Sequence, residues 1–348
     1  MIIIIVKEYI GKFIVDTVIY NVRSLHILLR KIKKHLKTIV KLFKNDCHFS
    51  IKLAIYGVMG NILGRVKPSI AQKAEKYRRK FVSNYLNYLL QGIINTNREK
   101  QNNGVCAHNA PIWVCWWTGI ESAPSLVKQC VRSIQKAAGE HPVYIITKEY
   151  FQEYLEIPTF ILEKVQNGNM CLANFSDYLR ISLLEKYGGL WLDATIYVPR
   201  ELPESIFENS LYTCKSPGAK GYLANGRWTS YCLGGWKNHL FFKMAKECFE
   251  CYWRSEEVSI DYLLVDYIFD IIYNNNYFVK TCFDCIPINN MQRNDLAGAM
   301  VKGECAKRFP EIITDETIVY KLSWRENYPL EAKDGEESVY SYFLKMNL

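Results

Sequence analysis

The chain has 348 residues, of which 49% are hydrophobic and 14% aromatic, and its 44 Lys and Arg against 35 Asp and Glu give a net charge of +9. This composition excludes a largely disordered chain, and the sequence has no heptad array or repeat of about 20 to 50 residues that would indicate a fibre or solenoid. No run of about 18 uninterrupted apolar residues is present, which argues against an ordinary membrane-spanning helix. We therefore expect a globular protein with one large or two modest domains.

Positive charge is concentrated in residues 1–100, which hold 20 Lys and Arg against 5 Asp and Glu. The other 248 residues hold 24 basic and 30 acidic side chains. Such asymmetry indicates an arm that meets a polyanion, either an anionic membrane or a nucleic acid. We expect a helical basic region over 1–100, a main domain over 106–330 and a C-terminal tail over 331–348.

The segment 30–44 has the pattern of a basic amphipathic helix. Five apolar residues recur at helical spacing, and lysines surround this stripe: Ile32, Leu36, Ile39, Val40 and Phe43. We expect residues 1–60 to bind an anionic membrane surface, where each Lys or Arg contributes about 1 kcal/mol. The alternative is a solvated helix whose stripe packs on the main domain. Nucleic acid is not expected, because no recognition module accompanies the charge.

The N-terminus does not read as a cleaved signal peptide, because the apolar run 2–6 is short and no positive region precedes it. The 12 cysteines are then expected as reduced thiols in a cytoplasmic protein, peripheral at the inner face of the plasma membrane. The pairs Cys248/Cys251 and Cys282/Cys285 have zinc-ligand spacing. Buried thiols are the favoured interpretation of these pairs, and a structural zinc site is the alternative.

After residue 109 the pattern changes to alternating strands and helices. We expect strands over 112–117, 143–147 and 190–192, and helices over 123–138 and 174–187. This succession predicts an α/β fold with a mostly parallel sheet. Ligands bind such sheets beyond the carboxyl ends of the strands.

One constellation lies around the second helix and the strand that follows it. Asp177 and Arg180 are three residues apart and share a helix face, and Asn174 or Ser176 is placed to cap the helix. Two glycines then allow a tight turn, which puts Asp193 at the end of a short strand. By themselves these residues indicate only a possible metal–diphosphate site, because Mg²⁺ and Mn²⁺ sites on phosphate substrates use only one or two carboxylates.

The arrangement Ser-Asp-X-X-Arg (176–180), Tyr-Gly-Gly (187–189) and Asp193 resembles the nucleotide-sugar region of glycosyltransferases related to family 32. It is more similar still to bacterial capsular polysaccharide synthesis proteins, whose opening strand resembles residues 112–119. The resemblance implies a GT-A fold and transfer of a sugar from a UDP or GDP donor to a glycan or lipid-linked glycan acceptor. It also suggests net retention of the anomeric configuration.

The same resemblance implies roles for single residues. Trp116 takes the place of an aromatic residue that stacks on the nucleotide base. Asp177 resembles the acid that binds the nucleoside or donor sugar, with Arg180 as its partner. Asp193 matches the first acid of the Asp-X-Asp motif, as catalytic residue and metal ligand, and Thr195 replaces the second acid. The cofactor implied is a divalent cation, Mn²⁺ or Mg²⁺, held by Asp193, Thr195 and the diphosphate.

Two further segments add candidates. In related sugar transferases a C-terminal loop closes over the diphosphate, which implicates Lys321, Ser323 and Trp324; the alternative is an ordinary terminal strand. Asp266 could serve an acceptor hydroxyl as base or hydrogen-bond partner. The alternative to an enzyme is a non-catalytic nucleotide-sugar or glycan-binding protein whose metal motif is degraded.

Overall fold

The computed structural model describes residues 22–63, 67–218 and 223–347. The chain forms two compact units, residues 1–88 with 258–264, and residues 89–257 with 265–348. The predicted apolar run 2–6 lies outside the described residues. No described helix is both long enough and apolar enough to cross a membrane.

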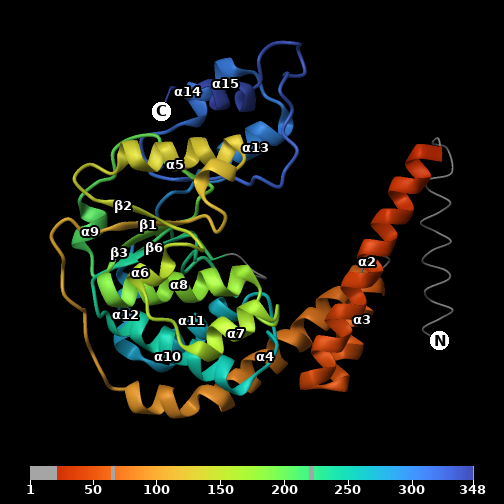
Figure 1. Cartoon of the computed structure of the whole chain (residues 1–348), viewed down its shortest axis with the longest axis vertical. Helices are drawn as coiled ribbons and strands as arrows, with labels where there is room; N and C mark the ends of the chain where they lie inside the picture. The colour runs from red at the N-terminus through yellow and green to blue at the C-terminus, as the bar shows by residue number, and fades with distance from the viewer. Residues whose placement is uncertain (1–21, 64–66, 219–222, 348) are drawn as a thin grey trace. The chain divides into compact units, whose positions relative to one another are not determined.

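The described N-terminal residues of the first unit are mostly helical, as the sequence predicts for this region. It contains α2 (Val22–Phe49), α3 (Ile51–Leu63) and the N-terminal part of α4 (Pro68–Asn97) (Figure 1). The Arg78 guanidinium on α4 forms two ion pairs, of 2.8 Å with Asp46 and 2.7 Å with Asp261. Because the side chain of Asp46 is almost completely buried, this pairing satisfies a charge that would otherwise be costly to fold.

The second unit is built on a five-stranded sheet in the order β2-β1-β3-β6-β5. β1 pairs in parallel with β2 and β3, and β6 pairs antiparallel with β3 and β5, so four of the five strands point in one direction. The mostly parallel sheet that the sequence predicts is therefore confirmed. The strands are β1 (Ile112–Cys115), β2 (Val143–Ile146), β3 (Gly189–Leu192), β5 (Leu211–Thr213) and β6 (Cys232–Gly235).

Helices cover both faces of this sheet. Figure 1 shows α5 (Ser125–Ala137) on one face and α8 (Leu172–Tyr187) on the other. The buried residues of α5 recur every three or four positions, which is why this helix presents one apolar face to the sheet. The other helices of the unit are α6 (Phe151–Tyr154), α7 (Thr159–Gln166), α9 (Ser205–Glu208), α10 (Leu240–Ser255), α11 (Leu264–Asn275), α12 (Tyr277–Cys285), α13 (Asp295–Lys302), α14 (Phe309–Ile312) and α15 (Val339–Lys345).

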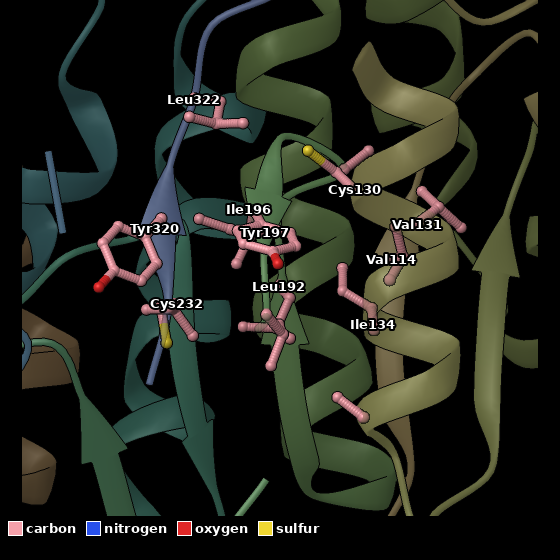
Figure 2. Packing of buried hydrophobic residues seen from close by; sticks show 14 of the residues in the cluster. Val114, Cys130, Val131, Ile134, Leu192, Ile196, Tyr197, Cys232, Tyr320 and Leu322 are labelled. Atoms are coloured by element: carbon pink, nitrogen blue, oxygen red, sulfur yellow. The ribbon is translucent and has the colours of Figure 1, made fainter. Parts of the chain in front are cut away.

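A second, two-stranded sheet brings a late part of the chain to the end of β3. β4 (Ile196–Tyr197) pairs antiparallel with β7 (Tyr320–Lys321), with Ile196 opposite Lys321. Tyr320 and Leu322 are both buried and belong to the hydrophobic core that also contains residues of α5 (Figure 2). Because side chains alternate along a strand, Lys321 between them is directed to the opposite face.

The turn before β3 requires its two glycines. Gly188 has a φ of +71° and Gly189 a φ of +95°, in a region that L side chains rarely adopt. A Cβ at Gly189 would collide with the carbonyl oxygen of Pro111, which accepts a hydrogen bond of 2.9 Å from the amide of Leu190. The close approach of β3 to the residue before β1 therefore depends on glycine.

Two local expectations differ from the structure. α8 begins at Leu172 after an extended Cys171, so Asn174 and Ser176 lie inside the helix and the predicted cap is wrong. The Asn174 side chain instead accepts a hydrogen bond of 3.3 Å from the Cys171 thiol within the first turn. The segment expected as a tail over 331–348 contains α15, whose Val339 and Phe343 are completely buried in the core.

Candidate functional site

Asp193 lies directly after β3 and is surrounded by hydrogen-bond donors. Its Oδ1 accepts from the Arg180 guanidinium at 3.2 Å and from the Trp191 indole at 3.0 Å. Its Oδ2 accepts from the Lys321 ammonium at 2.9 Å. Burial acts to raise the pKa of Asp193, but the charges of Lys321 and Arg180 outweigh it and hold the pKa well below its usual range. Asp193 is therefore a permanent anion between two cations.

The strand β3 places this carboxylate by simple alternation. Leu190 and Leu192 point into the core on the α5 side, and Trp191 and Asp193 point to the other side. The Asp193 amide also donates a hydrogen bond of 2.9 Å to the carbonyl of Tyr231, and this bond extends the pairing of β3 with β6 by one residue. The side chain remains 30% exposed, so a ligand can reach it.

Thr195 lies one tight turn further along the chain. The amide of Ile196 donates 2.9 Å to the carbonyl of Asp193, which closes the turn. The Thr195 hydroxyl accepts a hydrogen bond of 2.8 Å from the same Lys321 ammonium that binds Asp193. Both residues predicted as metal ligands therefore share one lysine partner.

Asp177 and Arg180 lie on α8 as the sequence predicts, and they form an ion pair of 2.6 Å. Arg180 joins Asp177 to Asp193 and lies over the ring of Trp191, 4.9 Å from its centroid. Burial raises the pKa of Asp177 to about 7, because it outweighs the lowering by Arg180 and acts together with the negative charge of Asp266. Arg180 therefore serves two carboxylates with very different acidities.

The two tryptophans after β1 have different surroundings. Trp117 packs edge-on against Phe175, at 5.4 Å between ring centroids. Trp116 and Trp324 pack edge to face, at 5.8 Å between ring centroids. The buried indole nitrogen of Trp116 has no hydrogen-bond partner among the residues that the structure describes. Because β1 and β3 are parallel neighbours, Trp116 and Asp193 both follow strands at the same edge of the sheet.

The remaining candidates are Ser323, Trp324 and Asp266. The Ser323 hydroxyl accepts from the amide of Arg325 at 3.3 Å and so shapes the turn that carries Trp324, which is 44% exposed. Asp266 accepts a hydrogen bond of 2.9 Å from the indole of Trp228, and its negative charge acts to raise the pKa of Asp177.

Several neighbours of the site were missed by sequence reasoning. Trp191 could have been found, because it lies two residues before Asp193 and so shares its side of the strand. Nothing in the sequence indicates Tyr231, whose ring centroid lies 5.0 Å from the Lys321 ammonium, or Arg293, whose carbonyl accepts a hydrogen bond of 2.7 Å from the Lys321 amide.

Among the described residues, one group of three side chains has the spacing of a metal site: Cys305, Asp334 and Glu336. It includes none of the residues around Asp193. It also includes none of the cysteines with zinc-ligand spacing, of which Cys248 is completely buried within α10.

Comparison with known proteins identifies the family. Residues 65–343 match the model of the family described as capsular polysaccharide synthesis protein. Among solved structures, the chain is similar to one titled "PaToxG Glycosyltransferase", with 16% identity and a TM-score of 0.35 over 57% of this chain and 78% of that one. No curated protein matches. Since the family model covers most of its length, the chain belongs to the capsular polysaccharide synthesis protein family.

Proposed function

We propose that this protein is a glycosyltransferase that moves a sugar from a nucleoside diphosphate donor to a glycan or lipid-linked glycan in capsule synthesis. The observation that carries the proposal is the convergence of Arg180 and Lys321 on Asp193 at the carboxyl edge of a mostly parallel sheet. Cations at such an edge suit a diphosphate, since they can stabilise the charge that develops on it as it leaves.

The aromatic residues beside this cluster support the same substrate. Trp116 and Trp324 contact each other, and the Arg325 guanidinium lies 5.2 Å from the ring centroid of Trp324. A flat nucleotide base can stack on an indole, and an arginine beside it can reach a phosphate. We extend the proposal to a UDP or GDP donor and to net retention, as the resemblance implies.

Donor turnover tests this proposal. We expect UDP or GDP, but not CMP, to raise the melting temperature of the protein, because a ligand that binds only the folded state stabilises it. The corresponding nucleotide sugar should be hydrolysed or transferred, with release of the nucleoside diphosphate. A thermal shift without turnover would favour the non-catalytic nucleotide-sugar-binding alternative, and neither a shift nor turnover would exclude both functions.

We also propose that α2 binds the anionic inner face of the plasma membrane. Leu36, Val40 and Phe43 are 38%, 53% and 40% exposed, and the neighbouring Lys37 and Lys41 are exposed as well. Apolar side chains next to lysines on one helix match a surface that offers acyl chains beneath anionic headgroups. Such a location would bring the enzyme close to a lipid-linked acceptor.

A further inference from the structure

Lys321 lies between the two side chains that an Asp-X-Asp motif offers to a divalent cation. Its ammonium donates a hydrogen bond of 2.9 Å to Asp193 Oδ2 and another of 2.8 Å to Thr195 Oγ1. A Mg²⁺ or Mn²⁺ ion held by this motif would need the same two oxygens, at about 2.1 Å. We infer that the ammonium of Lys321 takes the place of the divalent cation and holds the leaving diphosphate, an inference that rests on the proposed function.

The donor set around Asp193 does not fit the predicted Mn²⁺ or Mg²⁺. Thr195 offers a neutral hydroxyl where the motif usually has a second carboxylate, so the negative charge that attracts a divalent ion is halved. The other oxygen of Asp193 is already bonded to Arg180 and Trp191. A divalent ion here would also stand next to two positive side chains, Arg180 and Lys321, which already pair with the carboxylates of Asp177 and Asp193.

The fold fixes Lys321 in this position. Its amide donates a hydrogen bond of 2.7 Å to the carbonyl of Arg293. The amide of Leu322 donates one of 2.9 Å to the carbonyl of Thr195. The buried side chains of Tyr320 and Leu322 lock the strand from the other face (Figure 2). A shift of one residue would exchange these faces and bury the lysine, so the register is strongly specified.

Within the part of the chain that the structure describes, one N–H group of the ammonium has no hydrogen-bond acceptor and is available to a ligand. An ammonium carries three N–H groups, and Asp193 and Thr195 accept two of them. The Lys321 side chain is 27% exposed, so a phosphate oxygen can approach the third. Further positive charge comes from Arg293, whose carbonyl accepts from the Lys321 amide, and from Arg325 on the ring of Trp324.

The reaction then proceeds without a metal ion. The bond between the anomeric carbon and the diphosphate oxygen breaks, and its electron pair stays on that oxygen. A bond forms between the anomeric carbon and the acceptor's hydroxyl oxygen, whose proton passes to water. Lys321 stabilises the charge that grows on the diphosphate by a charge-assisted hydrogen bond and is itself unchanged.

Calorimetric titration of UDP and GDP tests the inference. We expect the nucleotide to bind with the same affinity in excess EDTA and in excess Mn²⁺. The variant Lys321→Met should bind at least about tenfold more weakly, because it loses a hydrogen bond from a charged group, and Lys321→Arg should recover part of the loss. The matched control is Lys307→Met, which removes a lysine from the exposed ion pair with Glu336. Circular dichroism spectra report whether each variant folds.

Two results would overturn the inference: nucleotide binding that requires Mn²⁺, or unchanged affinity of a folded Lys321→Met variant. Failure of the proposed function looks different, because then neither nucleotide binds with or without Mn²⁺. Direct titration with Mn²⁺, followed by the paramagnetic resonance of the free ion, still decides the cation question in that case. Tight Mn²⁺ binding that Asp193→Asn abolishes contradicts the inference, whereas no tight binding, or binding that survives this substitution, supports it.

Discussion

Lys321 and Asp193 lie 128 positions apart in the sequence and form an ion pair of 2.9 Å. The pairing of β4 with β7 brings them together, since it places Lys321 opposite Ile196, three residues after Asp193. The site therefore depends on a contact between the middle and the end of the second unit. Substitutions on either side of that contact should affect donor binding.

Asp193→Asn should reduce sugar transfer by at least about 100-fold, in the range seen when one electrostatic contact of an active site is removed. The amide keeps an oxygen that can accept from Arg180, but it no longer provides the charge that holds Lys321 in place. We expect an unchanged circular dichroism spectrum and a large fall in kcat. The control is Asp315→Asn, whose side chain is 99% exposed and pairs with Arg200. Wild-type turnover of Asp193→Asn would remove this residue from the mechanism.

Asp177 should make the stability of the protein depend on pH below neutrality. Its pKa is raised to about 7 in the folded protein and lies near 3.9 in an unfolded chain, so the folded state holds this proton more tightly. The contribution of Asp177 to the unfolding free energy is therefore greatest at low pH. It is lost as the pH rises towards about 7, by up to about 1.4 kcal/mol per pH unit.

Urea unfolding of the wild type and of Asp177→Asn between about pH 4 and 7 measures this contribution, because the amide of the variant does not titrate. The slope of the unfolding free energy against pH should be more positive in Asp177→Asn than in the wild type. The difference should reach up to about 1.4 kcal/mol per pH unit, which corresponds to one proton. Asp270→Asn is the control, since it removes another carboxylate–arginine pair of 2.6 Å, with Arg227. An identical pH dependence in wild type and Asp177→Asn would show that Asp177 is ionised throughout.

Tyr320→Phe should weaken the strand that carries Lys321. The Tyr320 hydroxyl accepts a hydrogen bond of 2.8 Å from the amide of Thr314 and donates one of 3.0 Å to the carbonyl of Ile312. The Tyr320 side chain is completely buried. Loss of the hydroxyl removes this partner of the buried Ile312 carbonyl and of the partly buried Thr314 amide, which costs about 1 to 3 kcal/mol of unfolding free energy. The control Tyr342→Phe removes the hydroxyl of a 40% exposed tyrosine and should cost less than about 0.5 kcal/mol. Equal stabilities of the two variants would contradict the role given to the Tyr320 hydroxyl.

How much of the fold and the site the sequence predicts depends on how far apart along the chain the interacting residues lie. The strand before Asp193 and the Asp177–Arg180 pair were accessible, because alternation along a strand and helical spacing are local rules. The contact of Lys321 with Thr195 spans 126 positions and depends on strands of only two residues, too short to give a pattern. The antiparallel strand β6 was missed for a similar reason, since its four residues include two glycines. The start of α8 was misplaced because the N-cap position before Leu172 is occupied by Cys171, a residue rarely considered as a cap.

Charge reversal on α2 tests the proposed membrane surface. Lys37→Glu with Lys41→Glu should release the protein from vesicles that contain phosphatidylserine, because each lysine contributes about 1 kcal/mol near an anionic surface and each glutamate opposes binding. Lys73→Glu with Lys76→Glu on α4 changes the net charge by the same amount and is the control, since both lysines are exposed. Co-sedimentation should fall by at least about tenfold for the α2 pair and much less for the α4 pair. Equal losses for the two pairs would mean that overall charge, and not the apolar and basic face of α2, determines binding.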